Sequence, residues 1–258
     1  MRLSVEGLCF SFGQSEVLHD ISFSVETGEF MSVLGPNGVG KSTLFRCILG
    51  ILPGYTGRIT VDGRDIRSLS RRERAAAVAY IPQIHRPTFG YSVLDTVLMG
   101  VGRQVNAFAQ PKQEHVELAA DALRRVGAEH LAQRDFSRLS GGEQQLVLVA
   151  RAIAQQSGIL VMDEPTSALD YGKQLHILRL IRGLADEGYS ILLSTHNPQH
   201  ALSYADSVLA LSAGNVAACG APAGLLDAEL IRRLYQVDVE FVSSDAGAVI
   251  VPKNGGST

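Results

Sequence analysis

The sequence contains few cysteines, and those present lie far apart. Cys9, Cys47 and Cys219 form no CxxC pair and no closely spaced group. Disulfide-stapled domains and structural zinc sites both need several cysteines at close, regular spacing. The scarcity of cysteine therefore argues against both classes and favours a reducing compartment.

A concentrated basic segment is also missing. The 23 Lys and Arg residues are balanced by 26 Asp and Glu residues, which gives a formal net charge of -3. The densest basic stretch, RSLSRRER at 67–74, contains a glutamate and is expected to be the solvated face of a helix. Surfaces that follow a phosphate backbone need more positive charge, so nucleic acid is not an expected partner.

The sequence has no long apolar run. No segment approaches the roughly 20 apolar residues that are needed to cross a bilayer. Residues 1–25 alternate polar and apolar side chains, unlike the continuous apolar core of a signal peptide. Any role at a membrane is therefore expected to depend on a partner.

Hydrophobic residues are nevertheless plentiful, at 46% of 258 residues, and they follow both strand and helix periodicities. Alternating patterns at 3–10 and 21–25, with a turn at Gly13, predict half-buried strands of an antiparallel sheet. Buried strands are predicted at 30–34, 78–81, 158–162 and 190–194, and helices at 112–126, 142–155 and 172–187. Such alternation predicts βαβ units and a mostly parallel sheet. Residues 83–137 have helical periodicity without a convincing strand, while short strands and turns are expected after about residue 210 and a loose tail at 254–258.

A glycine-rich loop follows the predicted strand at 30–34. Its sequence, GPNGVGKST from Gly35 to Thr43, satisfies G-x-x-x-x-G-K-[ST] and precedes a helical pattern at 42–49. Glycines let backbone N–H groups converge on phosphate oxygens, and the helix adds the positive end of its dipole. Lys41 supplies a point charge for the β and γ phosphates, and the Ser42 hydroxyl can ligate Mg²⁺. The loop predicts a nucleoside triphosphate site, although several P-loop families share it.

A pair of carboxylates ends the predicted strand at 158–162. Asp163 and Glu164 come at the carboxyl end of a parallel strand, where α/β sheets form their ligand crevice. Asp163 can then hold Mg²⁺, and Glu164 can act as the general base for an attacking water. The two acidic residues predict hydrolysis of the bound nucleotide.

A third motif, Leu139-Ser140-Gly141-Gly142-Glu143, precedes a helical pattern and the acidic pair. Glycine N–H groups and a serine hydroxyl at a helix N-terminus form a second anion site. The segment resembles the LSGGQ or LSGGE signature of ABC transporter ATPases. The resemblance extends from Leu3 to about Gly220.

The resemblance implies further site residues. Gln83 in YIPQ resembles the Q-loop glutamine, Asp170 in SALD belongs to a D-loop, and His196 in STH resembles the switch histidine. The implied catalytic groups are Glu164, His196 and Gln83, and the implied Mg²⁺ ligands are Ser42, Gln83 and Asp163. The implied ATP contacts are Phe12, Gly35, Asn37, Gly38, Val39, Gly40, Lys41, Ser42, Thr43, Ser140, Gly141, Gly142, Glu143 and Asp170. Phe12 aligns with an aromatic residue that stacks on adenine, but that residue is more often tyrosine and Phe10 is nearby, so a core role for Phe12 stays open.

The implied fold is α/β, a P-loop NTPase (RecA-like) core with an N-terminal antiparallel β region and an inserted α-helical signature subdomain. We predict a single ABC ATPase domain over 1–258. Its nucleotide-binding core is expected at 1–82 and 158–220, its helical subdomain at 83–157, and a C-terminal extension at 221–258.

The resemblance also implies partners. Two copies are expected to form a head-to-tail homodimer, in which the signature loop of one copy completes the ATP site of the other. The segment FGYSVLDTVLMG at 89–100, together with PTSALD and STHNP, is most similar to the ATPase subunits of importers for iron-siderophore complexes, haem, cobalamin or molybdate. Residues 83–100 are then expected to contact a membrane permease at the cytoplasmic face, with a periplasmic or lipoprotein solute-binding protein as an indirect partner.

Two residues depart from the family pattern. Gln144 occupies a position often held by arginine, and Asn197 a position often held by aspartate. Alternatives to an importer are the ATPase of an efflux system, a soluble non-transport ABC ATPase, and a regulatory protein that binds ATP without turnover. Long coiled-coil insertions, typical of the soluble class, are absent from the sequence. Glu164 argues against the regulatory alternative, because a protein that only binds ATP needs no base.

Overall fold

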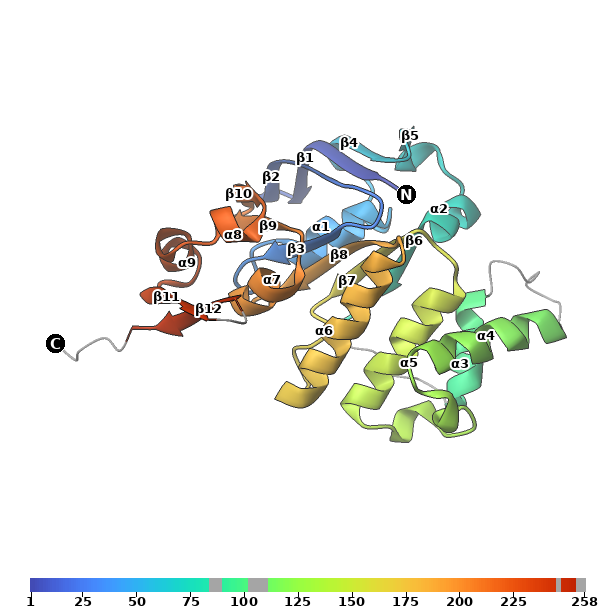
Figure 1. Ribbon diagram of the computed structural model, residues 1–258. Coiled ribbons are helices and arrows are strands. Elements are labelled where there is room, and N and C mark those ends of the chain that lie inside the picture. Colours follow the sequence, from blue (N-terminus) through green and yellow to red (C-terminus); the bar gives the residue numbers. More distant parts are fainter. Residues whose placement is uncertain (84–89, 102–110, 245–246, 254–258) are drawn as a thin grey trace.

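The computed structural model describes residues 1–83, 90–101, 111–244 and 247–253. An antiparallel sheet with the strand order β2-β1-β4-β5 forms the top layer in Figure 1. Its strands are β1 (Leu3–Phe12), β2 (Ser15–Val25), β4 (Thr56–Val61) and β5 (Arg64–Asp65). Leu3 and Val5 are buried with the predicted period of two, and after a register shift between Val5 and Leu8 the alternation resumes with Leu8 and Phe10. The strand β4 was not predicted.

A second sheet with the order β10-β9-β3-β8-β7-β6 lies at the centre of the molecule. It consists of β3 (Phe30–Leu34), β6 (Val78–Ile81), β7 (Ile159–Asp163), β8 (Ser190–Thr195), β9 (Ser207–Ser212) and β10 (Asn215–Gly220). All neighbours except β9 and β10 pair in parallel. The mostly parallel sheet is therefore confirmed, and the predicted bounds of its buried strands differ from the observed ones by at most one residue.

The register of the parallel strands brings several chain segments to one edge of this sheet. Leu34 pairs with Thr195, and Asp163 pairs with Ser194. The strands β3, β7 and β8 therefore end side by side. The residues that follow them share one crevice, as expected at the carboxyl ends of parallel strands.

Helices cover both faces of the central sheet. The helix α1 (Lys41–Ile48) packs between the two sheets through Leu44 and Phe45. The 3-10 helix η1 (Ile66–Ser68) and the helix α2 (Arg71–Ala77) follow β5, and Arg71 and Arg72 are exposed there, as predicted for the basic stretch. On the opposite face, α6 (Tyr171–Asp186) packs through Ile177.

The helices α3 (Val93–Val101), α4 (Gln113–Arg125) and α5 (Gly141–Ala154) form a separate layer at the lower right of Figure 1. The 3-10 helices η2 (Glu129–Leu131) and η3 (Phe136–Arg138) lie between α4 and α5. A Cβ atom at Gly100 would lie 2.2 Å from the carbonyl oxygen of Arg151, so this glycine permits the close packing of α3 on α5. Among the helices of the described residues, none combines the length and the apolar character that crossing a bilayer requires.

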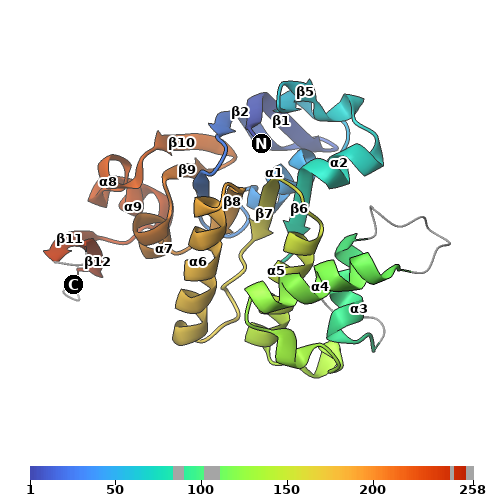
Figure 2. The same ribbon diagram turned by 45° about the vertical axis from the view of Figure 1, so that its right-hand side comes forward.

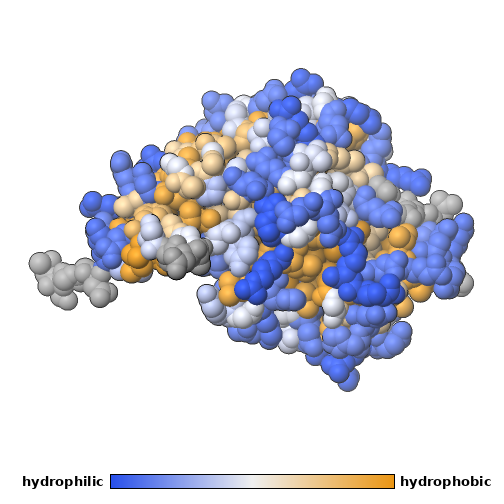
Figure 3. Space-filling view, in the orientation of Figure 1, coloured by the Kyte–Doolittle hydropathy of each residue, from blue (hydrophilic) through white to orange (hydrophobic). Residues whose placement is uncertain are grey.

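The C-terminal part differs from the prediction of strands and turns alone. After α7 (Pro198–Tyr204), β9 and β10 come α8 (Pro222–Leu225) and α9 (Ala228–Tyr235), and then a hairpin of β11 (Val239–Ser244) and β12 (Gly247–Pro252). The prediction was wrong for α9, because its apolar pattern spans only two turns. Leu230 and Leu234 bury this helix against Leu34 and Ala201. The extension forms the left end of the molecule in Figure 2, and apolar residues gather there and over the helical layer in Figure 3. The predicted tail at 254–258 lies outside the described residues.

Candidate functional site

The loop from Gly35 to Gly40 joins β3 to α1 in a conformation that depends on its glycines. Gly40 has a φ of 108°, and a Cβ atom there would lie 2.8 Å from Cδ2 of Leu18. A larger residue would therefore meet both backbone strain and a steric clash. The turn leaves the amides at the start of α1 open towards a cavity of about 280 Å³. The cavity is lined by Val17, Asn37, Gly38, Gly40, Lys41, Ser42, Thr43, Gln83 and Glu164.

Lys41 is a buried residue that lines this cavity. Its side chain is 5% exposed, and its ammonium donates hydrogen bonds to the carbonyl oxygens of Gly35, at 2.7 Å, and Pro36, at 3.0 Å. The same nitrogen lies 3.3 Å from Oε1 of Glu164. The loop thus curls around a buried positive charge, which suits a phosphate group.

One hydroxyl group contacts both residues of the acidic pair, the carboxylate of Asp163 and the backbone of Glu164. Ser194, fully buried on β8, donates a hydrogen bond of 2.7 Å to Oδ1 of Asp163. The backbone N–H of Glu164 donates to the same hydroxyl oxygen at 2.9 Å. Glu164 has a φ of 46°, an unusual value for a residue with a side chain, and such strain persists only where the surroundings enforce it. Ser194 therefore helps to fix the turn that directs Glu164 into the cavity.

The carboxylate of Glu164 is the centre of the polar contacts in the cavity. Besides the contact with Lys41, its Oε2 atom accepts a hydrogen bond of 3.1 Å from the amide nitrogen of Gln83. The Nδ1 atom of His196 lies 3.3 Å from the same oxygen, and the His196 side chain is half-exposed. The three predicted catalytic residues, Glu164, His196 and Gln83, are therefore brought together.

The predicted metal ligands supply oxygen donors around the same cavity. Ser42 and Gln83 line it, and Asp163 stands at the adjacent strand end. Since the amide nitrogen of Gln83 faces Glu164, its carbonyl oxygen is the atom that can face a cation. Hydroxyl, carbonyl and carboxylate oxygens are hard donors, so this set fits Mg²⁺ shared with phosphate groups and water.

The predicted signature residues do not line the cavity at Lys41. Ser140 caps α5, and it forms a capping box in which Glu143 accepts a hydrogen bond of 2.8 Å from the Ser140 backbone N–H. Hydrogen bonds from Ser140 lower the pKa of the Glu143 carboxyl group. None of the residues from Ser140 to Glu143 lines the cavity at Lys41. Gly141 instead lines a second hollow, which it shares with Gln83, Glu164 and Ser167.

Asp170 and Phe12 also lie outside the residues that line the cavity. Asp170 caps α6 by accepting a hydrogen bond of 3.0 Å from the backbone N–H of Lys173, and this hydrogen bond lowers the Asp170 pKa. The ring of Phe12 is 51% exposed and meets Phe10 edge to face at 4.9 Å. Phe12 is therefore not a core residue and is free to stack on a planar ring.

Four residues around the site have roles that the motifs did not predict. Ser194 and Ser167 contact the polar network of Glu164: the Ser167 hydroxyl donates to the Glu164 carbonyl oxygen at 3.1 Å. Gln144 donates from its amide to the carbonyl oxygens of Phe136 and Leu139. Asn197 caps α7 through Gln199. Serines at strand ends are common, so only the register of β7 and β8 could have identified Ser194.

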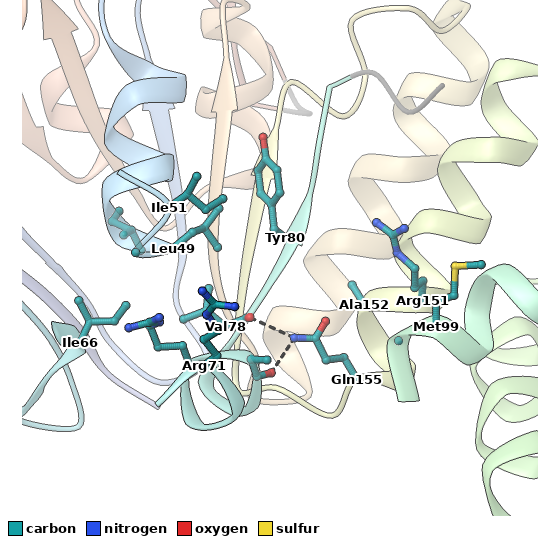
Figure 4. A pocket seen from close by; sticks show the side chains of 15 residues that line it. Leu49, Ile51, Ile66, Arg71, Val78, Tyr80, Met99, Arg151, Ala152 and Gln155 are labelled. Carbon is teal, nitrogen blue, oxygen red and sulfur yellow. Dashed lines mark hydrogen bonds between the residues drawn. The ribbon is translucent and has the colours of Figure 1, made fainter. Parts of the chain in front are cut away.

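A groove between the core and the helical layer forms a separate cavity of about 500 Å³. In Figure 4, Ile51 and Tyr80 lie on its core side, and Met99 and Arg151 lie on its helical side. Gln155 ties the two sides by donating to the carbonyl oxygens of Ala75 and Val78 (Figure 4). Burial lowers the pKa of Arg151, and burial with the charge of Asp163 raises the pKa of Tyr80 to about 12. Within the described part of the chain, Arg151 forms no ion pair.

Comparisons with known proteins agree with the motifs and the geometry. The family model described as ABC transporter matches residues 18–167. The chain is 39% identical over 241 residues to the hemin import ATP-binding protein HmuV of Thermobifida fusca, covering 93% of this chain and 84% of that protein. It is 35% identical over 252 residues to an iron chelatin transport ATP-binding protein of Helicobacter pylori, covering 97% and 99%. A solved inward-facing metal-chelate type ABC transporter superposes with a TM-score of 0.86 at 34% identity, covering 98% of both chains.

Proposed function

The chain belongs to the ABC transporter family, and we propose that it is the subunit whose ATP hydrolysis drives a metal-chelate or haem importer. The observation that carries the chemistry is the convergence of Lys41, Gln83 and His196 on the carboxylate of Glu164. A P-loop lysine, a buried carboxylate and two polar side chains in one crevice are groups that can support phosphoryl transfer to water.

In the proposed reaction, water attacks the γ-phosphorus of ATP, the bond to the β-γ bridging oxygen breaks, and ADP and phosphate leave. Glu164 accepts the proton of the attacking water, and Lys41 and His196 face the charge that develops on the phosphoryl oxygens. Mg²⁺ held by Ser42, Gln83 and Asp163 would neutralise phosphate charge. Backbone N–H groups of the loop from Gly35 to Thr43 would bind the phosphates, and Phe12 would stack on adenine.

The contact between Lys41 and Glu164 holds both side chains in place before ATP binds. Both groups are at least nine-tenths buried, so each needs a compensating charge while ATP is absent. Phosphate oxygens of ATP would replace the carboxylate as the partner of Lys41. Glu164 would then be released to face the water.

The position of the signature residues supports a homodimer. None of the residues from Ser140 to Glu143 lines the cavity at Lys41 of its own chain, so we expect them to bind the ATP that is held by the phosphate-binding loop of a second copy. Asp170, at the exposed start of α6, would contact that copy as well. In this arrangement ATP joins the two copies, and its hydrolysis releases them.

The groove at Met99 is the proposed docking site for the permease. Its lining combines apolar side chains with Arg71, Arg74 and Arg151, and Met99 is 51% exposed. An apolar helix with an acidic residue fits this lining. This surface extends the predicted contact region at 83–100 to the core side at Ile51 and Tyr80; of that region, 84–89 lies outside the described residues. The complex would lie at the cytoplasmic face of the membrane, with a solute-binding protein on the other side.

The experiment is copurification of the tagged full-length protein from its native membranes. We expect equimolar recovery of a many-helix permease, and uptake of haem or an iron chelate that depends on both proteins. Met99→Glu would place a charge in the groove and reduce permease recovery, whereas Val242→Glu, at an exposed apolar residue on β11 remote from the groove, would not. Recovery of soluble partners only would contradict the importer and favour a non-transport ATPase. Expulsion of solute by the recovered complex would instead identify an efflux system.

A further inference from the structure

The side chain of Gln199 connects the C-terminal hairpin to the segment that carries His196. Its amide nitrogen donates to the Ala248 carbonyl oxygen at 3.2 Å and to the Ser203 hydroxyl at 3.0 Å. Its amide oxygen accepts a hydrogen bond of 2.9 Å from the backbone N–H of Ile250. Both N–H groups of this amide donate hydrogen bonds, and its oxygen accepts one of the two that it can accept. Two of the three partner residues, Ala248 and Ile250, belong to β12.

Gln199 lies in the first turn of α7, three residues after His196. Asn197 caps that turn by accepting a hydrogen bond of 3.0 Å from the Gln199 backbone N–H. The backbone N–H of Asn197 in turn donates to the Thr195 hydroxyl at 3.0 Å. The backbone on both sides of His196 is therefore fixed by local hydrogen bonds, and the start of α7 is fixed to β12.

The hairpin is itself anchored to the body of the protein. Phe241 on β11 packs against the apolar cluster that contains Leu34, Ala201 and Leu234. Leu34 is the last residue of β3 before the phosphate-binding loop. Thus Gln199 ties α7 to an element that is anchored beside the strand leading into the nucleotide site.

We propose that Gln199 is a positioning residue for His196, and that the C-terminal hairpin is the support through which it acts. The inference rests on the proposed role of His196 at the γ-phosphate. His196 is half-exposed, and within the described residues its ion-pair contact is with a single oxygen of Glu164, so this contact restrains the side chain weakly. Holding the first turn of α7 limits the positions that the imidazole can take when ATP binds.

The test compares variants of the full-length protein in steady-state ATP hydrolysis. Gln199→Met keeps the length of the side chain but removes its hydrogen bonds. Ile250→Pro removes the backbone N–H that donates to the Gln199 amide oxygen. Because this N–H points to α7 and not to β11, the hydrogen bonds between β11 and β12 are retained. We expect kcat to fall about fivefold in both variants, with the KM for ATP changed less than about twofold, because remote misplacement of a catalytic group lowers turnover.

A double-mutant cycle distinguishes positioning from a general loss of stability. In a His196→Ala background, Gln199→Met should cause no further fall in single-turnover hydrolysis, because the residue it positions is gone. A fall by the same factor in both backgrounds, or an unchanged kcat in Gln199→Met alone, would overturn the proposal. Arg233→Met is the matched control. It removes a hydrogen bond of 2.8 Å that joins α9 of the same extension to the Ala217 carbonyl oxygen on β10 and does not involve α7.

Two readouts separate this inference from the proposed function. Absence of ATP hydrolysis in the wild-type protein would contradict the function itself. Amide hydrogen exchange at 196–204 tests the support without any turnover, and we expect faster exchange in Gln199→Met than in wild type and Arg233→Met. Equal exchange in all three proteins would refute the support by the hairpin.

Discussion

Ser194 offers the sharpest test of how the acidic pair is held. Ser194→Ala removes a buried hydroxyl that donates to Asp163 at 2.7 Å and accepts from the Glu164 backbone N–H at 2.9 Å. A hydrogen bond to a charged group contributes about 1.5–3 kcal/mol and a neutral one about 1 kcal/mol. We therefore expect the free energy of unfolding to fall by about 3 kcal/mol. Because the strained turn at Glu164 loses its restraint, we also expect kcat for ATP hydrolysis to fall about 10- to 100-fold.

The assay combines urea denaturation with steady-state ATP hydrolysis. Ser190→Ala is the control, since Ser190 is also fully buried on β8 but its hydroxyl donates to the Met1 carbonyl oxygen at the opposite end of the strand. The control should lose about 1 kcal/mol and retain wild-type turnover. Wild-type turnover in Ser194→Ala, or an equal loss of turnover in Ser190→Ala, would refute the assignment.

Two further predictions concern the phosphate-binding loop and pH. Gly40→Ala should lose ATP binding measured by calorimetry and about 1–3 kcal/mol of stability, because of the φ of 108° and the clash with Leu18; unchanged binding would contradict the geometry. His200 is buried, and burial followed by the charge of His196 lowers its pKa below the ordinary 6.5. Just below pH 6.5 the unfolded state therefore binds more protons at His200 than the folded state does. The contribution of neutral His200 to the free energy of unfolding should be fully present above pH 6.5 and should decline as the pH falls below it. His200→Phe should flatten this decline in thermal unfolding, and an unchanged decline would exclude His200 as its source.

The central sheet could be predicted because its strands are short, continuous apolar runs. Phe30–Leu34 is buried along its whole length and Val78–Ile81 is buried except at Tyr80, and the bounds of both strands match the prediction. The strand β4 carries polar side chains in its first half, which hides its period, and its pairing with β1 depends on distant residues. The helix α9 is short and its burial depends on α7 and β3, so its local pattern was weak.

The motifs predicted which residues meet at Glu164 but not how they are held. Lys41, Gln83 and His196 come from separate segments, and each follows a strand whose end is aligned in the sheet. The contacts of Ser194 and Gln199 depend on strand register and on the position of the hairpin. A side chain that acts through such long-range packing leaves no signal in its sequence neighbourhood.

The measurement closest to the central claim is ATP hydrolysis and molar mass of the Glu164→Gln variant beside the wild-type protein, each with Mg²⁺ and ATP. The substitution keeps the size of the side chain and removes the proton acceptor. The account predicts that the variant binds ATP, loses most of its turnover and accumulates as a dimer in light scattering, whereas the wild-type protein hydrolyses ATP and returns to monomer. A variant that hydrolyses ATP at the wild-type rate, or that binds ATP and stays monomeric, would contradict it.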